Sequence, residues 1–276
     1  MPPSESLPAA AGVGRVALCV RDLESVCAFY RDTVGLDVFE RSDERATLGA
    51  GDEALLELRG DADATPRGPT ETGLYHTAFR VPDRGALGAA LERIDGLSGA
   101  SDHLVSEALY LDDPEGNGVE IYRDRPRNEW PEGPDGRVRM ETRPLDLDAL
   151  RSASTGAASA PDATTVGHVH LSVSSLADSR AFYADALGLR VRQTVSGAAF
   201  LAAGEYHHHV GLNTWENRTE PTGESGLEWF ELRAPADAAR AARERLSAAG
   251  YATDSVSDTV VSVSDPDGIG LRIRPA

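Results

Sequence analysis

The chain has 276 residues, 41% of them hydrophobic, and a formal net charge of -18 at pH 7 without a single lysine. This length predicts two domains or several small modules, and the mean hydropathy of -0.32 predicts a globular protein. Nucleic acid is excluded as an expected partner, because the sequence offers no basic cluster that could neutralise a phosphate backbone.

The acid excess indicates one of two sources. It is typical of proteins from salt-saturated cytoplasms, where ions screen self-repulsion over a few ångströms. The alternative is an acidic mesophile protein from a GC-rich genome. Both sources are compatible with the composition.

The N-terminal segment, residues 1–12, has no basic region and no sustained apolar run, which predicts a disordered tail rather than a signal peptide. No stretch approaches the roughly 18 apolar residues of a membrane span. Cys19 and Cys27 fall on a predicted strand and a predicted helix, which indicates neither a disulfide framework nor a zinc site. We therefore expect a cytoplasmic protein with no membrane partner, as a monomer or a homo-oligomer.

An internal repeat dominates the rest of the sequence. The stretch "GRVALCVRDLESVCAFYRDTVGLDV" from Gly14 aligns without gaps to "GHVHLSVSSLADSRAFYADALGLRV" from Gly167, with 12 of 25 positions identical. The same offset aligns "GLYHTAFRVP" with "GLEWFELRAP", and one residue less aligns "DDPEGNGVEIYR" with "SDPDGIGLRIRP". The chain is therefore a tandem duplication.

Each half contains two similar pieces. A strand of period 2 precedes an amphipathic helix, a helix stop such as Gly188 follows, and short β-rich segments complete the order βαβββ. We expect four such modules in an α+β fold, two in the N-terminal half (13–125) and two in the C-terminal half (166–276). Their predicted ranges are 13–60, 73–125, 166–215 and 226–275, with a Pro, Gly and Asp-rich connector at 126–165.

These modules, with their recurring "AFY" and "GL", resemble the vicinal-oxygen-chelate superfamily of glyoxalases, bleomycin-resistance proteins and extradiol dioxygenases. The run "DHLVSEALYLDDPEGNGVE" resembles the extradiol ring-cleavage signature, and Ser101 departs from it. The residues that fill this signature are His103, Tyr110, Pro114, Gly116 and Glu120. Together with "YHHHVGLNTW", the run is most similar to two-half bacterial catechol 2,3-dioxygenases.

The resemblance implies a metal site. In the superfamily, ligands come from the first strand of one module and from the first and last strands of its partner, which implies His168 with His76 and Glu120. The equivalent positions of the first and fourth modules hold Arg15, Trp229 and Arg272. Glu57 lies in this second pair, where a solvated strand-end carboxylate is the simpler interpretation.

The ligand positions also predict the pairing of modules. If modules paired in sequence order, His168 would stand beside a Trp and an Arg. If the second module pairs with the third to form the active cup, two imidazoles and one carboxylate converge, a set that suits Fe(II) and leaves positions open for substrate and oxygen. We expect the second arrangement, with Fe(II) as cofactor and Mn(II) as the alternative.

Further residues are candidates for the pocket. We expect catalytic roles for His209, His103 and Tyr110, and substrate contacts from His170 and His207. If residues 207–209 form a strand, His207 and His209 point one way and His208 the other. The resemblance implies that His209 faces the cup without binding the metal, where an imidazole can move a proton.

The resemblance implies an extradiol dioxygenase of aromatic catabolism, whose partners are a small aromatic diol and O2. Two other classes remain open. A glyoxalase-like isomerase or lyase would use the same fold with Ni or Zn and usually a second carboxylate. A metal-free binding protein of the bleomycin-resistance kind would have no need for His76, His168 and Glu120 together.

Overall fold

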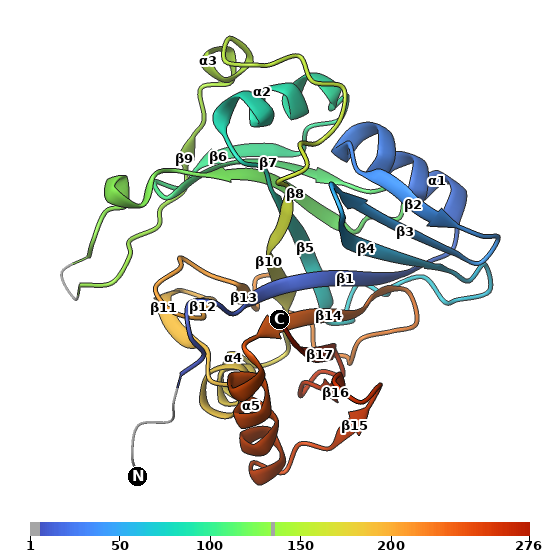
Figure 1. Ribbon diagram of the computed structural model, residues 1–276, viewed down its shortest axis with the longest axis vertical. Coiled ribbons are helices and arrows are strands. Elements are labelled where there is room, and N and C mark those ends of the chain that lie inside the picture. The colour runs from blue at the N-terminus through green and yellow to red at the C-terminus, as the bar shows by residue number, and fades with distance from the viewer. Residues whose placement is uncertain (1–5, 134–135) are drawn as a thin grey trace. The chain divides into compact units, whose positions relative to one another are not determined.

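The computed structural model describes residues 6–133 and 136–276, and it contains four successive βαβββ repeats (Figure 1). The first repeat contains β1 (Gly12–Val20), α1 (Leu23–Phe29) with its π-helical continuation η1 (Tyr30–Val34), β2 (Asp37–Arg41), β3 (Arg45–Ala50) and β4 (Glu53–Gly60). The second contains β5 (Gly73–Arg80), α2 (Arg84–Arg93), β6 (Gly99–Asp102), β7 (Ser106–Asp112) and β8 (Gly118–Asp124).

The C-terminal half has the same order of elements. The third repeat contains β10 (Thr165–Ser172), α4 (Leu176–Arg180) with its π-helical continuation η3 (Ala181–Ala186), β11 (Arg190–Val195), β12 (Ala198–Ala202) and β13 (Val210–Asn213). The fourth contains β14 (Gly226–Ala234), α5 (Ala236–Ala248), β15 (Thr253–Ser255), β16 (Val261–Ser264) and β17 (Gly270–Pro275). The predicted α+β class is confirmed.

The strands form two sheets. One has nine strands in the order β11-β12-β13-β10-β5-β8-β7-β6-β9, drawn from the third and second repeats and the connector. The other has eight strands in the order β15-β16-β17-β14-β1-β4-β3-β2, drawn from the fourth and first repeats. The predicted pairing of the second module with the third is therefore confirmed. Each sheet combines one module of the N-terminal half with one module of the C-terminal half.

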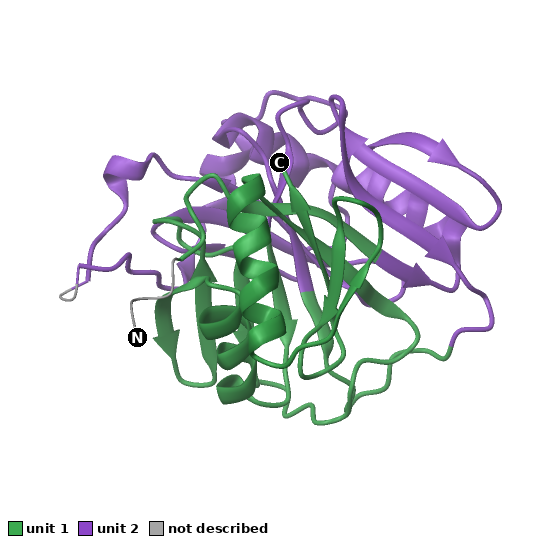
Figure 2. Cartoon of the chain, turned by 60° about the horizontal axis from the view of Figure 1, so that its bottom comes forward, with its two compact units in different colours: residues 1–17, 65–75, 168–276 green, residues 18–64, 76–167 purple. Residues whose placement is uncertain are grey.

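The chain divides into two compact units (Figure 2). Unit 1 comprises residues 1–17, 65–75 and 168–276, and unit 2 comprises residues 18–64 and 76–167. Three of the four boundaries fall within β1, β5 and β10, so each of these strands begins in one unit and ends in the other, and the fourth follows residue 64 in the loop after β4. No helix among the described residues is long and apolar enough to cross a membrane.

Local sequence explains the helix boundaries. Asp22, Asp83 and Ser175 precede α1, α2 and α4, and each side chain accepts a hydrogen bond from the backbone N–H three residues on. Gly35 and Gly188 end the two π-helical turns with φ of 91° and 98°, a left-handed conformation that glycine adopts without steric cost. The predicted helix stop at Gly188 is confirmed.

The prediction of a disordered tail is wrong for residues 6–12, whereas residues 1–5 lie outside the described part of the chain. Leu7 is buried, its N–H donates to the carbonyl of Gly188 at 2.8 Å, and its carbonyl accepts from Gly204 at 3.1 Å. β1 itself begins at Gly12. Burial of Leu7 and Ala11 and the two backbone hydrogen bonds of Leu7 stabilise the position of this segment within unit 1.

The connector contributes structure of its own in η2 (Arg127–Glu129), β9 (Arg143–Pro144) and α3 (Leu147–Arg151). β9 pairs with β6, where Asp102 faces Arg143 in the register. Figure 1 shows α3 above α2. At Gly88 of α2, an added Cβ would lie 2.7 Å from the carbonyl oxygen of Leu150, so this glycine permits the close packing of the two helices.

The repeated "AFY" and Asp-Pro motifs meet inside each unit. In unit 1 the hydroxyl of Tyr183 donates to the carboxylate of Asp265 at 2.9 Å, and in unit 2 Tyr30 donates to Asp113 at 3.5 Å. Burial is the main cause that raises the pKa of both carboxyls, that of Asp265 to about 6. These pairs join the helix to the last hairpin of the neighbouring repeat, so the motifs have a structural role.

Asp265 makes stability depend on pH. Its folded pKa lies above the ordinary value of 3.8, so the folded state binds the proton more tightly than the unfolded state does. The stabilisation that this proton gives the folded state is lost as the pH rises from about 4 to about 6. Two pKa units correspond to about 3 kcal/mol. We expect Asp265→Asn, measured by urea unfolding, to gain free energy of unfolding relative to wild type as the pH rises from 4 to 7. The exposed Asp258→Asn should show no such trend, and a trend in both variants would contradict the explanation.

Candidate metal site and its histidines

A buried imidazole and a buried carboxylate meet on neighbouring strands of unit 2. β5 and β8 are parallel, with Ala78 facing Glu120 in the register. The Nε2 of His76 lies 3.0 Å from Oε2 of Glu120, and the two side chains are 8% and 3% exposed. A carboxylate is rarely buried without a partner, because removing its charge from water is costly.

His168 of β10 completes a group of three potential ligands. One ligand atom each from His76, Glu120 and His168 lies within 4.8 Å of the other two, and all three residues are buried. Atoms that bind one ion at about 2.1 Å are at most about 4.2 Å apart, so the spacing needs only a small contraction to suit one ion. We call these three residues the candidate metal group. These are the three residues that the resemblance implied as ligands, and their role as ligands stays a prediction.

His103 and Tyr110 form a hydrogen-bonded dyad in unit 2. The Tyr110 hydroxyl lies 2.6 Å from His103 Nε2, and His103 Nδ1 lies 2.8 Å from the backbone carbonyl of Glu141. Tyr110 faces Glu120 in the register of β7 and β8, so both side chains lie on one face of the sheet. The ring of Tyr110 is 5.7 Å from that of His76 between centroids. The dyad therefore adjoins two members of the candidate metal group.

The histidine run does not form a strand, so the prediction of alternating faces is wrong. β12 ends at Ala202 and β13 begins at Val210, and His207–His209 lie in the loop between them. Gly204, with φ of 57°, turns the backbone before the run. The Nδ1 atoms of His207 and His208 are 2.7 Å apart, a contact that side chains on opposite faces of a strand could not make.

This loop brings His208 rather than His209 beside His168. The ring centroids of His208 and His168 are 4.0 Å apart, and those of His207 and His168 are 6.1 Å apart. His209 instead stacks on Tyr206 at 4.7 Å, and its Nδ1 accepts the N–H of Ala203 at 3.1 Å. His208 is the residue that sequence reasoning missed, and no sequence signal could have found it, because its direction depends on the path of the loop.

His170 lies two residues from His168 on the same face of β10. Its ring is surrounded by those of Tyr75, Trp215 and Phe200, at centroid distances of 5.2, 5.4 and 5.7 Å. Opposite it, a Cβ at Gly211 would lie 2.8 Å from the imidazole, so the glycine makes room for the ring. The expected substrate contacts of His170 and His207 stay predictions.

In the first and fourth repeats, the positions equivalent to the candidate metal group hold a cluster of two arginines and a tryptophan, within unit 1. The guanidinium of Arg272 lies 3.7 Å from the centroid of the Trp229 ring, and that of Arg15 lies 5.8 Å from it. Two guanidinium groups on an indole form cation-π contacts and have no lone pair for a metal ion. Glu57 of unit 2 is near Arg45 at 3.7 Å. These positions cannot reproduce the candidate metal group.

Comparisons with known proteins agree with this architecture. Residues 12–121 and 165–273 each match the Glyoxalase/Bleomycin resistance protein/Dioxygenase superfamily. The chain is 39% identical over 267 residues to a catechol-2,3-dioxygenase of Bacillus subtilis (strain 168), covering 92% of this chain and 93% of the relative.

Solved structures with low sequence identity share the fold. A candidate dioxygenase from Bacillus subtilis subsp. subtilis str. 168 has a TM-score of 0.65 at 16% identity, covering 96% of this chain and 84% of the other. Glyoxalase I from Zea mays has a TM-score of 0.60 at 18% identity, covering 96% and 92%. With both halves matched and one relative similar over nearly its whole length, the chain belongs to the glyoxalase/bleomycin resistance protein/dioxygenase superfamily.

Proposed function

We propose that this protein is an extradiol dioxygenase that uses Fe(II) and O2 to cleave catechol, or a simple substituted catechol, in the ring bond next to the diol. The observation that carries the proposal is the candidate metal group, with two imidazoles and one carboxylate buried together. The 39% identity to a catechol-2,3-dioxygenase supports the same reaction class.

The donor set fits the proposed metal. Two neutral nitrogens and one carboxylate oxygen are typical of non-haem Fe(II) sites with open coordination positions, and Mn(II) accepts similar ligands. When bound there, the ion would bring catechol and O2 together and favour ionisation of the diol. The carboxylate of Glu120, already 3.0 Å from His76, would balance part of the ion's charge.

The chain's own residues would orient the substrate and handle its protons. The Tyr110 oxygen would accept a hydrogen bond from a catechol hydroxyl, since its own proton is directed to His103. His170, within its aromatic surroundings, would contact the substrate ring. We propose His208 for the proton-moving role that sequence similarity assigned to His209, and its ring contact with His168 supports this choice.

Two alternatives predict different chemistry. A glyoxalase-like isomerase would usually have a second carboxylate ligand, whereas the candidate metal group contains one. A metal-free binding protein would gain nothing from burying these three side chains together, because each pays a desolvation cost. Both observations favour the dioxygenase.

Metal analysis and oxygen uptake test the proposal directly. Protein purified without air is expected to contain about one iron or manganese per chain and to consume one O2 per catechol cleaved, forming a muconic semialdehyde-type product. Absence of metal would favour the binding protein. Metal without oxygen uptake, combined with isomerisation of a glyoxalase substrate, would favour the isomerase.

A further inference from the structure

A residue of the connector contacts the imidazole of His103. We infer that this residue, Glu141, is a positioning residue for the Tyr110–His103 dyad. This inference rests on the proposed function for its catalytic meaning. It concerns the connector, residues 126–165, whose sequence indicates only a link between the two halves. In the structure, part of this segment pairs with β6 through β9 and reaches the imidazole of His103.

The contact with Glu141 fixes which ring nitrogen of His103 carries the proton. A backbone carbonyl can only accept hydrogen bonds. His103 Nδ1, at 2.8 Å from the Glu141 oxygen, must therefore be the donor. In the neutral ring Nε2 is then the acceptor, so the Tyr110 hydroxyl donates to it across 2.6 Å. Toward a substrate hydroxyl, the Tyr110 oxygen would therefore act as a hydrogen-bond acceptor.

The side chain of Glu141 holds its own backbone in place. Arg139 donates to Oε1 through Nε at 2.8 Å and also through Nη2. Arg143 donates to Oε2 through Nε at 2.9 Å and Nη2 at 2.7 Å. Each carboxylate oxygen thus accepts two charge-assisted hydrogen bonds from one guanidinium, carried by a residue two positions away. Glu141 is therefore tied to the residues two positions before and two positions after it.

The turn that carries His103 is fixed from the other side by Asp102. Its Oδ1 accepts the N–H of Leu104 at 2.8 Å, and its Oδ2 accepts from Nη2 of Arg125 at 2.7 Å. Leu104 has φ of 69°, a left-handed conformation that is unfavourable for leucine and needs such support. Asp102 and Leu104 flank His103, so the imidazole is held at its backbone and at its ring.

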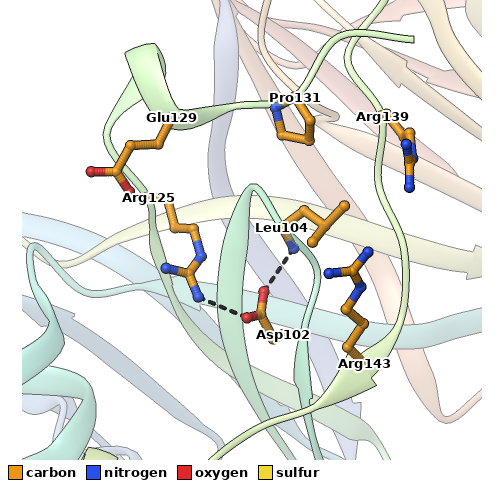
Figure 3. Close-up of a pocket in the computed structure, with 7 residues that line it drawn as sticks. All are labelled: Asp102, Leu104, Arg125, Glu129, Pro131, Arg139 and Arg143. Carbon is orange, nitrogen blue, oxygen red and sulfur yellow. Dashed lines mark hydrogen bonds and ion pairs between the residues drawn. The ribbon is translucent and has the colours of Figure 1, made fainter.

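Figure 3 shows Asp102, Leu104 and the three arginines beside a pocket of unit 2. The pocket has a volume of about 410 Å³. Its lining residues are Asp102, Leu104, Arg125, Glu129, Pro131, Arg139 and Arg143. The side chains of Arg139 and Arg143 are 51% and 52% exposed. Ion pairs this exposed are individually weak and are screened by salt. The hold on His103 therefore depends on cooperation between the two arginines and Glu141.

The tautomer of His103 can be measured without turnover. Nitrogen-15 NMR of the histidine rings in the metal-free protein is expected to show a proton on Nδ1 of His103 and an acceptor-type Nε2. In Glu141→Ala the ring should become a mixture of tautomers, and kcat with catechol should fall about 10-fold, the lower end of losses from misoriented supporting groups. Glu141→Gln, which keeps one acceptor for a guanidinium, should recover part of both signals.

Glu129→Ala is the matched control, because Glu129 lines the same pocket and is itself part of the connector. This variant should match wild type in ring spectrum and kcat. A proton on Nε2 of wild-type His103 would overturn the inference, as would an unchanged ring spectrum or an unchanged kcat in Glu141→Ala. Arg139→Gln provides a second test of the same anchor if Glu141→Ala unfolds. If only the proposed function is wrong, the wild-type protein will take up no oxygen with catechol, while its His103 ring still carries the proton on Nδ1.

Discussion

Glu120→Ala is expected to lose bound metal and to lower oxygen uptake with catechol by about 10³-fold or more, since several kcal/mol of metal-dependent stabilisation disappear. The substitution removes one of three ligand atoms that lie within 4.8 Å of one another, and it leaves His76 without its 3.0 Å partner. His76→Ala and His168→Ala should give the same result. Metal per chain by mass spectrometry and oxygen uptake measure the two effects.

The repeat provides a matched control for this prediction. Glu57 lies on the last strand of the first repeat, in the module pair whose other positions hold arginines and a tryptophan. Its carboxylate lies 3.7 Å from Arg45. Glu57→Ala should keep both metal and activity. Normal metal content in Glu120→Ala would refute the ligand assignment, provided that circular dichroism shows the variant to be folded.

His208→Ala is expected to retain its metal and to lose about 10²-fold in turnover with catechol, the usual scale for a positioned proton donor or acceptor. The reason is that the His208 ring lies 4.0 Å between centroids from that of His168, a member of the candidate metal group, and 5.1 Å from that of Phe200. Stopped-flow kinetics under saturating oxygen would separate this loss from weaker substrate binding.

His209→Ala distinguishes the geometric assignment from the one based on sequence similarity. The Nδ1 of His209 accepts a backbone N–H, so its neutral ring carries the proton on Nε2 and supports the loop between β12 and β13. We expect a loss of less than about 10-fold together with a lower melting temperature. A loss of 10²-fold in His209→Ala, with His208→Ala close to wild type, would return the role to His209.

Much of the fold was determined locally and could be predicted from the sequence. The repeat offset identified four modules, and residues such as Asp22, Asp83 and Gly188 mark helix ends through short-range hydrogen bonds and backbone sterics. Interactions between residues three or four positions apart depend little on the rest of the chain. For the same reason, positions aligned across repeats indicated which side chains share a strand position.

Only the tertiary structure decided how distant or irregular segments act. The direction of His208 depends on a loop in which Gly204 turns the chain, and strand periodicity carries no information about such a path. The connector reads as a Pro, Gly and Asp-rich linker, yet Glu141 lies 38 positions from His103 and contacts its ring. Contacts of this kind arise from strand pairing between β6 and β9. Such pairing is set by the packing of the whole unit. In addition, the group that orients the imidazole is a backbone carbonyl, which every residue type carries and which therefore leaves no signature in the sequence.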